Sequence, residues 1–283
     1  MRVLSASIEL SNLISALKKE GKSIGFVPTM GALHEGHFSL IQRAKDENEV
    51  VVVSIFVNPL QFNNEQDLAK YPRIIEQDLE GLKKLNIDVV FTPSEKELYP
   101  EKPVVSIDFG KMATVLEGEF RSGHFEGVGI VVSKLLHLTQ PDRAYFGLKD
   151  LQQFILIRKM CTDLNFPTEI IGVGTVREDS GLALSSRNAR LSDKGRKEAT
   201  IIFKGLNRFR SGILKKEDFD SILKNVNEMF FSAEGFDLEY LRVVDPADLS
   251  EIKSYDTVTE LAVCVAGYVE GVRLIDNLYL RLK

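Results

Sequence analysis

The sequence predicts an α/β protein: a doubly wound, parallel, Rossmann-like sheet followed by a smaller C-terminal α+β domain. Along residues 1–175, short and continuously apolar segments alternate with longer segments of helical periodicity. Apolar strands of this kind are typical of a parallel sheet buried on both faces, with helices as crossovers. Near residue 175 the alternation stops, and two helical segments precede three strand-like ones. We therefore expect two domains, 1–175 and 176–283, with the second forming a lid.

The elements of the first domain follow from the spacing of apolar residues. Helical spacing predicts helices at 8–20, from about residue 36, and at 74–85, 126–138 and 150–163. Apolar runs between them predict strands at 24–27, 50–57, 89–91, 143–146 and 168–173. We expect Pro28 to end the first of these strands. The β-branched run at 50–57 should be a central strand.

The second domain has a different order of elements. Helical patterns cover 192–211 and 217–233, and strands are expected around 238–244, 259–266 and 273–280. Such a grouping of helices and then strands indicates an α+β arrangement.

Composition excludes several classes of protein. The chain has 36 basic and 41 acidic residues, a net charge of −5, and no block of like charge. Binding to nucleic acid or to a membrane through a basic face is therefore not expected. Cys161 and Cys264 are too few and too far apart for a disulfide framework or a cysteine metal site. With no signal-like start and no apolar run of transmembrane length, we expect a cytoplasmic protein.

The most informative stretch joins the first strand to the next helix. His34 and His37 lie three residues apart at a predicted helix start, with Gly36 between them. Both imidazoles can therefore face one ligand, and the glycine lets that ligand approach the backbone. Helix N-termini at the carboxyl ends of parallel strands are favoured sites for phosphate. Helix capping by a surface histidine is the simpler alternative.

The segment Pro28–His37 resembles the pantothenate synthetase (pantoate–β-alanine ligase) family, and His34-Glu35-Gly36-His37 is similar to the His-x-Gly-His signature of nucleotidylyltransferases. The resemblance implies ligation of pantoate and β-alanine with ATP through pantoyl adenylate, giving pantothenate, AMP and pyrophosphate. It also implies magnesium and a homodimer. The ATP-binding residues that it implies are Met30, Gly31, Ala32, Leu33, His34, Glu35, Gly36, His37, Gly147, Leu148, Lys149, Asp150, Val176, Leu184, Ser185, Ser186 and Arg187.

Amide side chains follow the predicted central strand, in Asn58-Pro59-Leu60-Gln61-Phe62. Amides suit a small hydroxy acid because they donate and accept hydrogen bonds at once. Taken alone, Asn-Pro more often marks a turn. The segment resembles the family's pantoate-binding stretch, which assigns Gln61, and with it Asn58, to pantoate.

A metal ligand is expected further along, at the start of the helix at 74–85. The family has acidic residues there that can take magnesium, but this chain has Gln77 beside Asp78. Magnesium often needs only one carboxylate together with substrate phosphates. Asp78 is therefore the metal candidate, and a plain surface charge is the alternative.

Two further segments resemble the family. In the glycine-rich stretch 118–128, Arg121 can meet a substrate phosphate or carboxylate as a fork, whereas His124 has either a structural or a catalytic role. In 145–153, between a strand and a helix, the resemblance implies that Lys149 binds phosphate, that Asp150 helps hold the nucleoside, and that Gln153 holds pantoate with Gln61. On charge alone, a solvated pair of Lys149 and Asp150 is the simpler alternative, and Asp150 also suits the helix N-terminus.

The polar segment 176–188 contains Ser185, Ser186 and Arg187 and lies at the proposed domain boundary. Its sequence resembles the family's counterpart of the Lys-Met-Ser-Lys-Ser loop. We expect it to be mobile without nucleotide and to close over ATP. The resemblance implies that the catalytic residues are His34, His37, Lys149, Ser185, Ser186 and Arg187.

Two other functions share part of this pattern. Another adenylyl or cytidylyl transferase would have the paired histidines but no need of amides around a small acid. A non-catalytic nucleotide-binding module would not need the Ser185–Arg187 loop as well. Product analysis with ATP, magnesium, pantoate and β-alanine distinguishes the three.

Overall fold

The computed structural model describes residues 1–63 and 65–282. The chain forms two compact units. The first unit comprises Met1–Leu148 and Gln153–Gly174, and the second comprises Lys149–Gln152 and Thr175–Lys283. The short segment Lys149–Gln152 thus groups with the C-terminal part of the chain, although it includes the first two residues of a helix, Leu151–Asp163, that otherwise belongs to the first unit.

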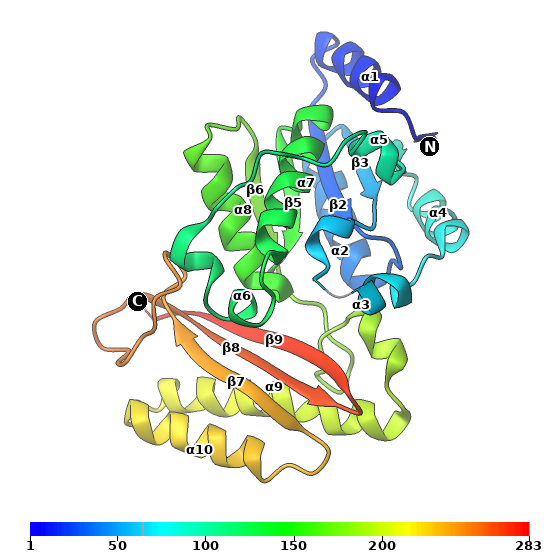
Figure 1. Ribbon diagram of the computed structural model, residues 1–283. Helices are drawn as coiled ribbons and strands as arrows, with labels where there is room; N and C mark the ends of the chain where they lie inside the picture. Colours follow the sequence, from blue (N-terminus) through cyan, green and yellow to red (C-terminus); the bar gives the residue numbers. More distant parts are fainter. Residues whose placement is uncertain (64, 283) are drawn as a thin grey trace. The chain divides into compact units, whose positions relative to one another are not determined.

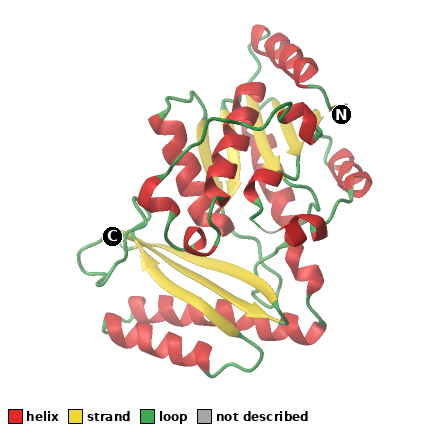
Figure 2. Ribbon diagram, viewed as in Figure 1, coloured by secondary structure: helices red, strands yellow, loops and turns green. Residues whose placement is uncertain are grey.

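The first unit is built on a six-stranded sheet in the order β1-β4-β3-β2-β5-β6, in which all recorded neighbours are parallel. Strands are yellow and helices red in Figure 2. The strands are β1 (Arg2–Leu4), β2 (Ile24–Thr29), β3 (Val50–Ile55), β4 (Val89–Phe91), β5 (Arg143–Gly147) and β6 (Glu169–Val173). The predicted doubly wound fold is confirmed. The chain order reverses between β2 and β5, and ligands of such sheets bind at the carboxyl ends of strands beside that point.

Helices connect these strands. They are α1 (Ser7–Lys19), α2 (Glu35–Glu47), α3 (Glu65–Lys70), α4 (Ile75–Lys84), α5 (Glu95–Leu98), α6 (Glu117–Phe120), α7 (His124–Thr139) and α8 (Leu151–Asp163). The long helices were predicted within a few residues, whereas α3, α5, α6 and strand β1 were not. These four elements are too short to show a period. No helix within the described ranges is both long and apolar enough to cross a membrane.

Pro28 does not end its strand, contrary to the prediction. Strand β2 continues to Thr29, and Pro28 pairs with Ser54 of β3. On the other side of β2, pairing with β5 includes only Gly25 and Phe26. Pro28 therefore lies where the strand has one partner only, which is the situation in which a sheet tolerates proline.

Apolar residues bury both faces of the sheet. Val27, Val51 and Val53 form one cluster with Ile41 of α2 and Leu82 of α4. Successive side chains of a strand point to opposite faces. The alternate residues, such as Phe26 and Val52, are fully buried as well, and α7 packs against β2. The carboxyl end of β2 is thus held rigidly from both sides.

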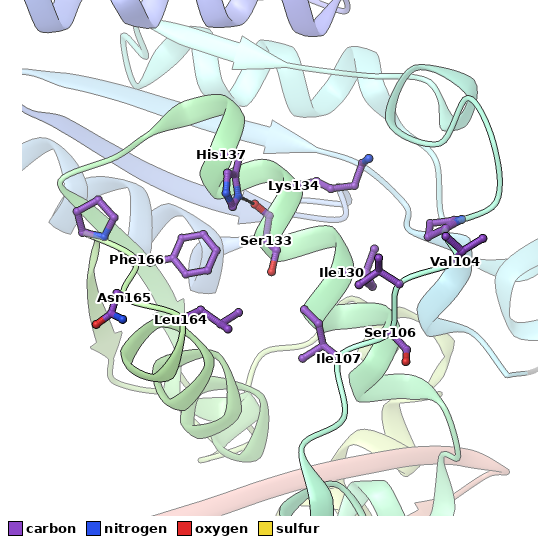
Figure 3. A pocket seen from close by; sticks show the side chains of 13 residues that line it. Val104, Ser106, Ile107, Ile130, Ser133, Lys134, His137, Leu164, Asn165 and Phe166 are labelled. Carbon is purple, nitrogen blue, oxygen red and sulfur yellow. Dashed lines mark hydrogen bonds between the residues drawn. The ribbon is translucent and has the colours of Figure 1, made fainter.

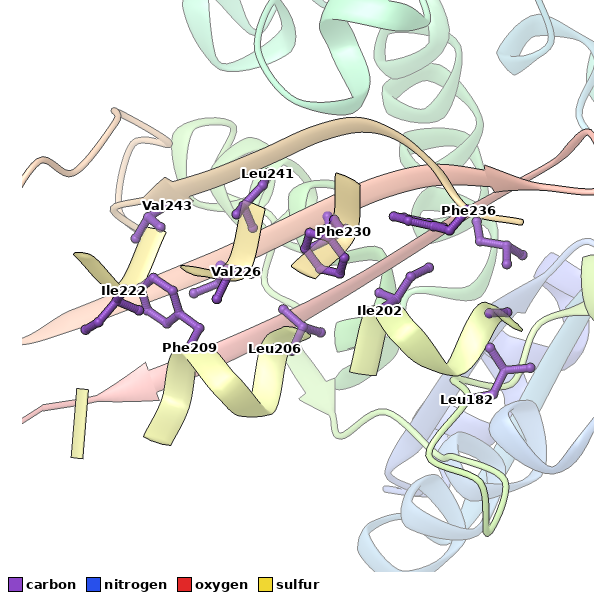
Figure 4. Packing of buried hydrophobic residues seen from close by; sticks show 14 of the residues in the cluster. Leu182, Ile202, Leu206, Phe209, Ile222, Val226, Phe230, Phe236, Leu241 and Val243 are labelled. Atoms are coloured by element: carbon purple, nitrogen blue, oxygen red, sulfur yellow. The ribbon is translucent and has the colours of Figure 1, made fainter. Parts of the chain in front are cut away.

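The second unit is an antiparallel sheet covered by two helices. Strands β7 (Asp237–Val244), β8 (Glu260–Val269) and β9 (Val272–Arg281) pair in that order, and α9 (Asp193–Leu214) and α10 (Phe219–Phe231) lie along one face (Figure 1). Their shared core includes Leu182, Ile202, Leu206, Phe209, Ile222, Val226, Phe230, Phe236, Leu241 and Val243 (Figure 4). The predicted α+β segment is confirmed.

Candidate active site

The two motif histidines cap helix α2 at the carboxyl end of β2. The backbone N–H of Gly36 donates to His34 Nδ1 at 3.1 Å. The backbone N–H of His34 donates to His37 Nδ1 at 3.3 Å. Together these bonds form a capping box, with imidazoles in the roles usually filled by hydroxyl and carboxyl groups. The helix start therefore fixes both rings.

This cap also determines which ring nitrogen of each histidine can donate a hydrogen bond to a ligand. Because Nδ1 of His34 and of His37 accepts a backbone N–H, the proton of each neutral ring is on Nε2. The ring centroids lie 4.2 Å apart with 47° between the planes, and both side chains are half-buried. The helix start thus presents two imidazole Nε2–H donors beside its own backbone N–H groups, an arrangement suited to a phosphate.

The loop before His34 is held by Asp78. The carboxylate of Asp78 accepts the N–H of Ala32 at 2.9 Å and that of Leu33 at 2.8 Å. Gly31 and Ala32 both have positive φ angles, 79° and 51°, so the loop adopts a conformation that is costly for alanine. At Gly31, a Cβ would lie 2.9 Å from Asp78 Oδ2. Asp78 therefore stabilises the tight turn that precedes helix α2 and sets the direction in which that helix begins.

Asp78 is poorly placed to be a metal ligand. Its side chain is only 3% exposed, and both of its oxygens accept backbone N–H groups. Burial, which outweighs these two hydrogen bonds, raises the pKa of its carboxyl above the usual range. Within the described residues, no three His, Cys, Asp or Glu side chains are grouped as a metal site. The residues present do not form a protein cage for magnesium.

Gln61 lies beside the loop, at the end of a 3-10 turn (Pro59–Gln61) that follows β3. Its Nε2 donates to Met30 Sδ at 3.0 Å, which joins the two segments predicted to bind substrate. Asn58 donates to Gln61 Oε1 and to the carbonyl of Gly127, both at 3.1 Å, and is 1% exposed. The amide of Asn58 is thus used by the protein itself. The predicted contact of Asn58 with pantoate stays a prediction, and these bonds favour a role in supporting Gln61 instead.

The glycine-rich stretch ends one helix and begins the next. Arg121 follows α6, and its Nη1 lies 3.8 Å from Glu117 Oε2. Gly123, with φ of 79°, precedes α7. His124 begins α7, is 5% exposed and contacts the carbonyl of Gln61 through Nδ1 at 2.8 Å. Of the two roles left open for His124, this geometry supports the structural one.

In the second unit, Lys149 and Asp150 lie in a 3-10 turn (Leu148–Asp150). Lys149 Nζ is 3.8 Å from Asp150 Oδ1, and the Lys149 side chain is 18% exposed. Asn277 of β9 donates its Nδ2 hydrogen to the Lys149 carbonyl at 2.8 Å. The backbone of the predicted phosphate ligand is therefore fixed to β9. Gln153 belongs to the first unit and is half-buried.

The segment expected to be mobile is tied to the second unit. Backbone bonds join Glu178 to Leu182 at 2.9 Å and Leu184 to Val176 at 3.0 Å, so residues 176–184 form a hairpin. Arg177 forms a two-pronged pair with Asp276 of β9, including an Nη2–Oδ1 bond of 2.9 Å. Leu182 is 5% exposed and belongs to the core. These contacts differ from the expectation of a poorly anchored loop.

The predicted serines and arginine come directly after this hairpin. Ser185 caps a 3-10 turn (Ser186–Arg190), and its Oγ accepts the N–H of Arg187 at 3.2 Å. Asn188, 4% exposed, donates its Nδ2 hydrogen to the carbonyl of Ala183 at 3.0 Å. The turn thus holds Ser185, Ser186 and Arg187 on a fixed backbone.

Comparison with known proteins agrees with these features. The model of the pantoate-β-alanine ligase family matches residues 2–279. A pantothenate synthetase of Cytophaga hutchinsonii is 48% identical over 266 residues, 94% of each chain. The chain belongs to the pantoate–β-alanine ligase family. Pantothenate synthetase from Thermus thermophilus aligns with a TM-score of 0.92 and 42% identity, covering 98% of this chain and 99% of that chain.

A second solved member of the pantoate–β-alanine ligase family carries ligands. The enzyme of Francisella tularensis, described as complexed with "Beta-gamma ATP and Beta-alanine", aligns with a TM-score of 0.80 and 39% identity, covering 98% of this chain and 97% of that one. The resemblance seen in Pro28–His37 is confirmed by these matches. The chain is a ligase that forms pantothenate from pantoate and β-alanine.

The ligase residues predicted from sequence fall into two groups. The first unit brings Met30 and Gln61 into contact and holds His34 and His37 at the start of α2. The first unit also contains Arg121, Gly147, Leu148 and Gln153, whereas the second unit contains Lys149, Asp150, Val176, Leu184, Ser185, Ser186 and Arg187. Sequence reasoning missed Tyr99, whose hydroxyl donates to Asn58 Oδ1, Asp276, which anchors the hairpin before Ser185 through Arg177, and Asn277, which donates to the Lys149 carbonyl. A buried Tyr or Asp in an ordinary strand or turn carries no local signal of such a role.

A separate cavity of about 740 Å³ in the first unit of this ligase contains none of the predicted site residues (Figure 3). It lies between the extended segment 103–107, the second half of α7 and the segment 164–167. Its lining is mostly apolar, with Lys134 and His137 as its charged or titratable members. Two of the lining residues, Val104 and Val105, are 99% and 69% exposed.

Proposed function

We propose that His34 and His37 hold the phosphates of ATP and stabilise the first transition state of pantothenate formation. The observation that carries this proposal is the imidazole capping box, which leaves each neutral ring with Nε2 as its donor at a helix start. Fixed donors aimed at developing charge stabilise a transition state without reorganisation. The loop Met30–Leu33, with Glu35 and Gly36, would form the nucleotide cradle.

In the proposed first step, a carboxylate oxygen of pantoate attacks the α-phosphorus of ATP. An acyl–phosphate bond forms, the bond to the β-phosphate oxygen breaks, and pyrophosphate leaves. Lys149, Ser185, Ser186 and Arg187 would neutralise the triphosphate, and Asp150 would hold the nucleoside. Gly147, Leu148, Val176 and Leu184 would line the nucleotide.

In the proposed second step, the amine of β-alanine attacks the acyl carbon of pantoyl adenylate. The amide bond forms, AMP leaves with the electrons of the acyl–oxygen bond, and the nitrogen loses a proton. No protein nucleophile is needed, because both substrates are themselves nucleophiles. The enzyme contributes alignment and charge stabilisation. Gln61 and Gln153 would hold pantoate, and Arg121 a substrate carboxylate.

Magnesium would arrive with ATP. Its ordinary partners in such sites are substrate phosphates and water, with few protein ligands. Because Asp78 uses both oxygens within the protein, Gln77→Asp should alter the apparent magnesium requirement only modestly.

The second unit is proposed to act as the lid. An acyl adenylate exposed to water would hydrolyse, so closure protects the intermediate. The anchored hairpin favours movement of the unit as a body, carrying Ser185–Arg187 with it, over ordering of a loose loop.

We also propose that the protein is a homodimer and that it acts in the cytoplasm. Val104 and Val105, two exposed apolar side chains, line an apolar cavity. An exposed apolar surface of this kind is typical of an interface, and in a two-fold dimer the same surface of each copy would cover that of the other. Val105→Asp should therefore shift the native mass from dimer to monomer, while Ile8→Asp, at another exposed apolar residue, should not. A monomeric native chain would contradict the dimer.

Product analysis tests the reaction itself. Purified protein is mixed with ATP, magnesium, pantoate and β-alanine, and pantothenate, AMP and pyrophosphate are measured. Equal amounts of the three are expected. Pantoyl adenylate should accumulate when β-alanine is omitted. ADP in place of AMP would refute the proposed mechanism.

A further inference from the structure

Asn58 has no hydrogen-bonding capacity left for a ligand. A carboxamide offers two N–H donors and an oxygen with two lone pairs. Both donors of Asn58 are used, by Gln61 Oε1 and by the carbonyl of Gly127. Its oxygen accepts the hydroxyl of Tyr99 at 2.9 Å and the N–H of Leu60 at 3.4 Å. Asn58 is therefore a junction between Gln61 and groups further from the substrate.

The junction sets the orientation of the Gln61 amide. Asn58 Nδ2 can only donate, so the atom of Gln61 that faces it must be the oxygen. The nitrogen of Gln61 then faces Met30 Sδ, 3.0 Å away. Gln61 is 6% exposed, so a flipped amide would leave buried donors facing each other. One rotamer and one orientation of Gln61 are thereby selected.

Tyr99 holds the side-chain oxygen of Asn58 in place. It follows helix α5 and is 9% exposed. Its ring packs against Phe56 with centroids 6.0 Å apart, and Lys134 Nζ lies 5.6 Å from the ring centroid. Burial raises the pKa of the phenol, so the hydroxyl remains a donor at working pH. Without this donor, the oxygen of Asn58 would keep only the long bond from Leu60.

His124 fixes the backbone of the same glutamine. A carbonyl oxygen can only accept, so His124 Nδ1 donates to Gln61 O across 2.8 Å. Helix α7 approaches so closely that a Cβ at Gly127 would lie 2.2 Å from the carbonyl oxygen of Leu60. The first turn of α7 therefore locks the 3-10 turn that ends at Gln61.

We propose that Tyr99 and His124 are positioning residues for the acid substrate: Tyr99 holds the Gln61 amide through Asn58, and His124 holds the Gln61 backbone. The inference rests on the proposed role of Gln61 in binding pantoate. Neither Tyr99 nor His124 need touch the substrate. Their effect is to remove the ordering cost that a free glutamine side chain would add to binding.

Tyr99→Phe is the first test, because it removes one oxygen and keeps the ring. We expect KM for pantoate to rise about threefold to tenfold, as for loss of one hydrogen bond, with KM for ATP nearly unchanged. Tyr145→Phe is the matched control: this buried tyrosine bonds to Glu47 and Asn48 at the other end of the sheet. It should leave KM for pantoate unchanged. Equal changes in both variants would overturn the inference.

His124 is tested by a pair of variants. His124→Leu removes the donor and should raise KM for pantoate. His124→Asn keeps a donor near the position of Nδ1 and should recover most of the loss. If the two variants behave alike while remaining folded by circular dichroism, the contact with Gln61 does not position the substrate.

A double-mutant cycle separates positioning from general stability. If Tyr99 acts through Gln61, then Tyr99→Phe should have no further effect on KM for pantoate in a Gln61→Ala background. Additive effects would show a purely structural role. If Gln61→Ala alone leaves KM for pantoate unchanged, the proposed role of Gln61 fails. A rise with Gln61→Ala but not with Tyr99→Phe would overturn the positioning inference only.

Discussion

At the scale of single residues, we propose that each motif imidazole has two tasks that use different nitrogens. Nδ1 caps helix α2, and Nε2 carries the proton of the neutral ring. His37→Ala should therefore cost about 1 kcal/mol of unfolding free energy through the lost cap. Single-turnover formation of pantoyl adenylate should slow about 10²-fold to 10³-fold, the usual effect of removing a transition-state donor.

A matched variant on the same helix controls for general damage. Gln42 is exposed on α2 and bonds to Asp46 one turn later. Gln42→Ala should lower stability slightly and leave adenylate formation unchanged. If His37→Ala forms adenylate at the native rate, the imidazole has no role in the first step.

Asp78 gives a prediction about pH. Burial raises the pKa of its carboxyl above the ordinary value of 3.8, so the folded state keeps this proton to a higher pH than the unfolded state. Unfolding releases the proton between the two pKa values, and the stability contributed by Asp78 falls as pH rises through that window. The difference in unfolding free energy between native protein and Asp78→Asn should therefore shrink from about pH 4 upwards.

Glu97 provides a control of opposite sign. It accepts the N–H of Ser7 at 2.7 Å, and this hydrogen bond lowers the pKa of its carboxyl. The difference in unfolding free energy between native protein and Glu97→Gln should therefore grow as pH rises through the lowered pKa of Glu97. Denaturant unfolding of the three proteins between pH 3 and pH 7 measures both slopes. A flat difference for Asp78→Asn would mean that burial and the two N–H bonds cancel, and a difference that grows with pH would mean that the two N–H bonds dominate.

The residues show where sequence reasoning stops. The spacing of His34 and His37 on a helix start was visible, because three residues correspond to nearly one turn. The partners of Asn58 and Asp78 within the chain were not visible, because the sequence does not show which backbone groups satisfy a side chain. Their partners, such as Gly127 and Ala32, are 69 and 46 residues away in the chain.

At the scale of elements, the close approach of α7 to the 3-10 turn before Phe62 depends on one glycine. Alanine is normally better than glycine within a helix by about 1 kcal/mol. At Gly127, however, a Cβ would lie 2.2 Å from a backbone oxygen, so one of the two backbones must move. Gly127→Ala should therefore be destabilising by about 1–3 kcal/mol despite its helix propensity, and should raise KM for pantoate.

Gly174→Ala is the control for Gly127→Ala. A Cβ there would meet no atom within 4 Å, so little change in melting temperature or in pantoate binding is expected. Calorimetry on both variants decides the point. A Gly127→Ala protein as stable as the native one would show that α7 can move away without loss.

The elements also show which parts of the fold a sequence reveals. Long helices and buried strands were predicted because period and hydrophobicity act over many residues. The hairpin at 176–184 looked like a polar loop, because its stability depends on Asp276, almost a hundred residues later. Such long-range ion pairs leave no local pattern.

At the scale of the whole molecule, the ligase divides its predicted site residues between two compact units. We therefore expect reaction without hydrolysis of the adenylate to depend on how firmly each group is fixed within its own unit. In the second unit that anchoring runs through Arg177, which pairs with Asp276 and stacks on Phe203, with Cζ 4.5 Å from the ring centroid.

Arg177→Lys tests whether this anchoring protects the intermediate. Lysine keeps the positive charge but loses the planar fork and the stacking, a loss of about 1–3 kcal/mol for charged hydrogen bonds. Amide exchange of residues 176–184 should accelerate, and AMP should be released in excess of pantothenate because water reaches the adenylate. Arg208→Lys, which alters an ion pair with Glu217 in the same unit, should keep the two products equal. If Arg177→Lys leaves the amide exchange of residues 176–184 unchanged and still releases equal amounts of AMP and pantothenate, then anchoring of the hairpin does not protect the intermediate.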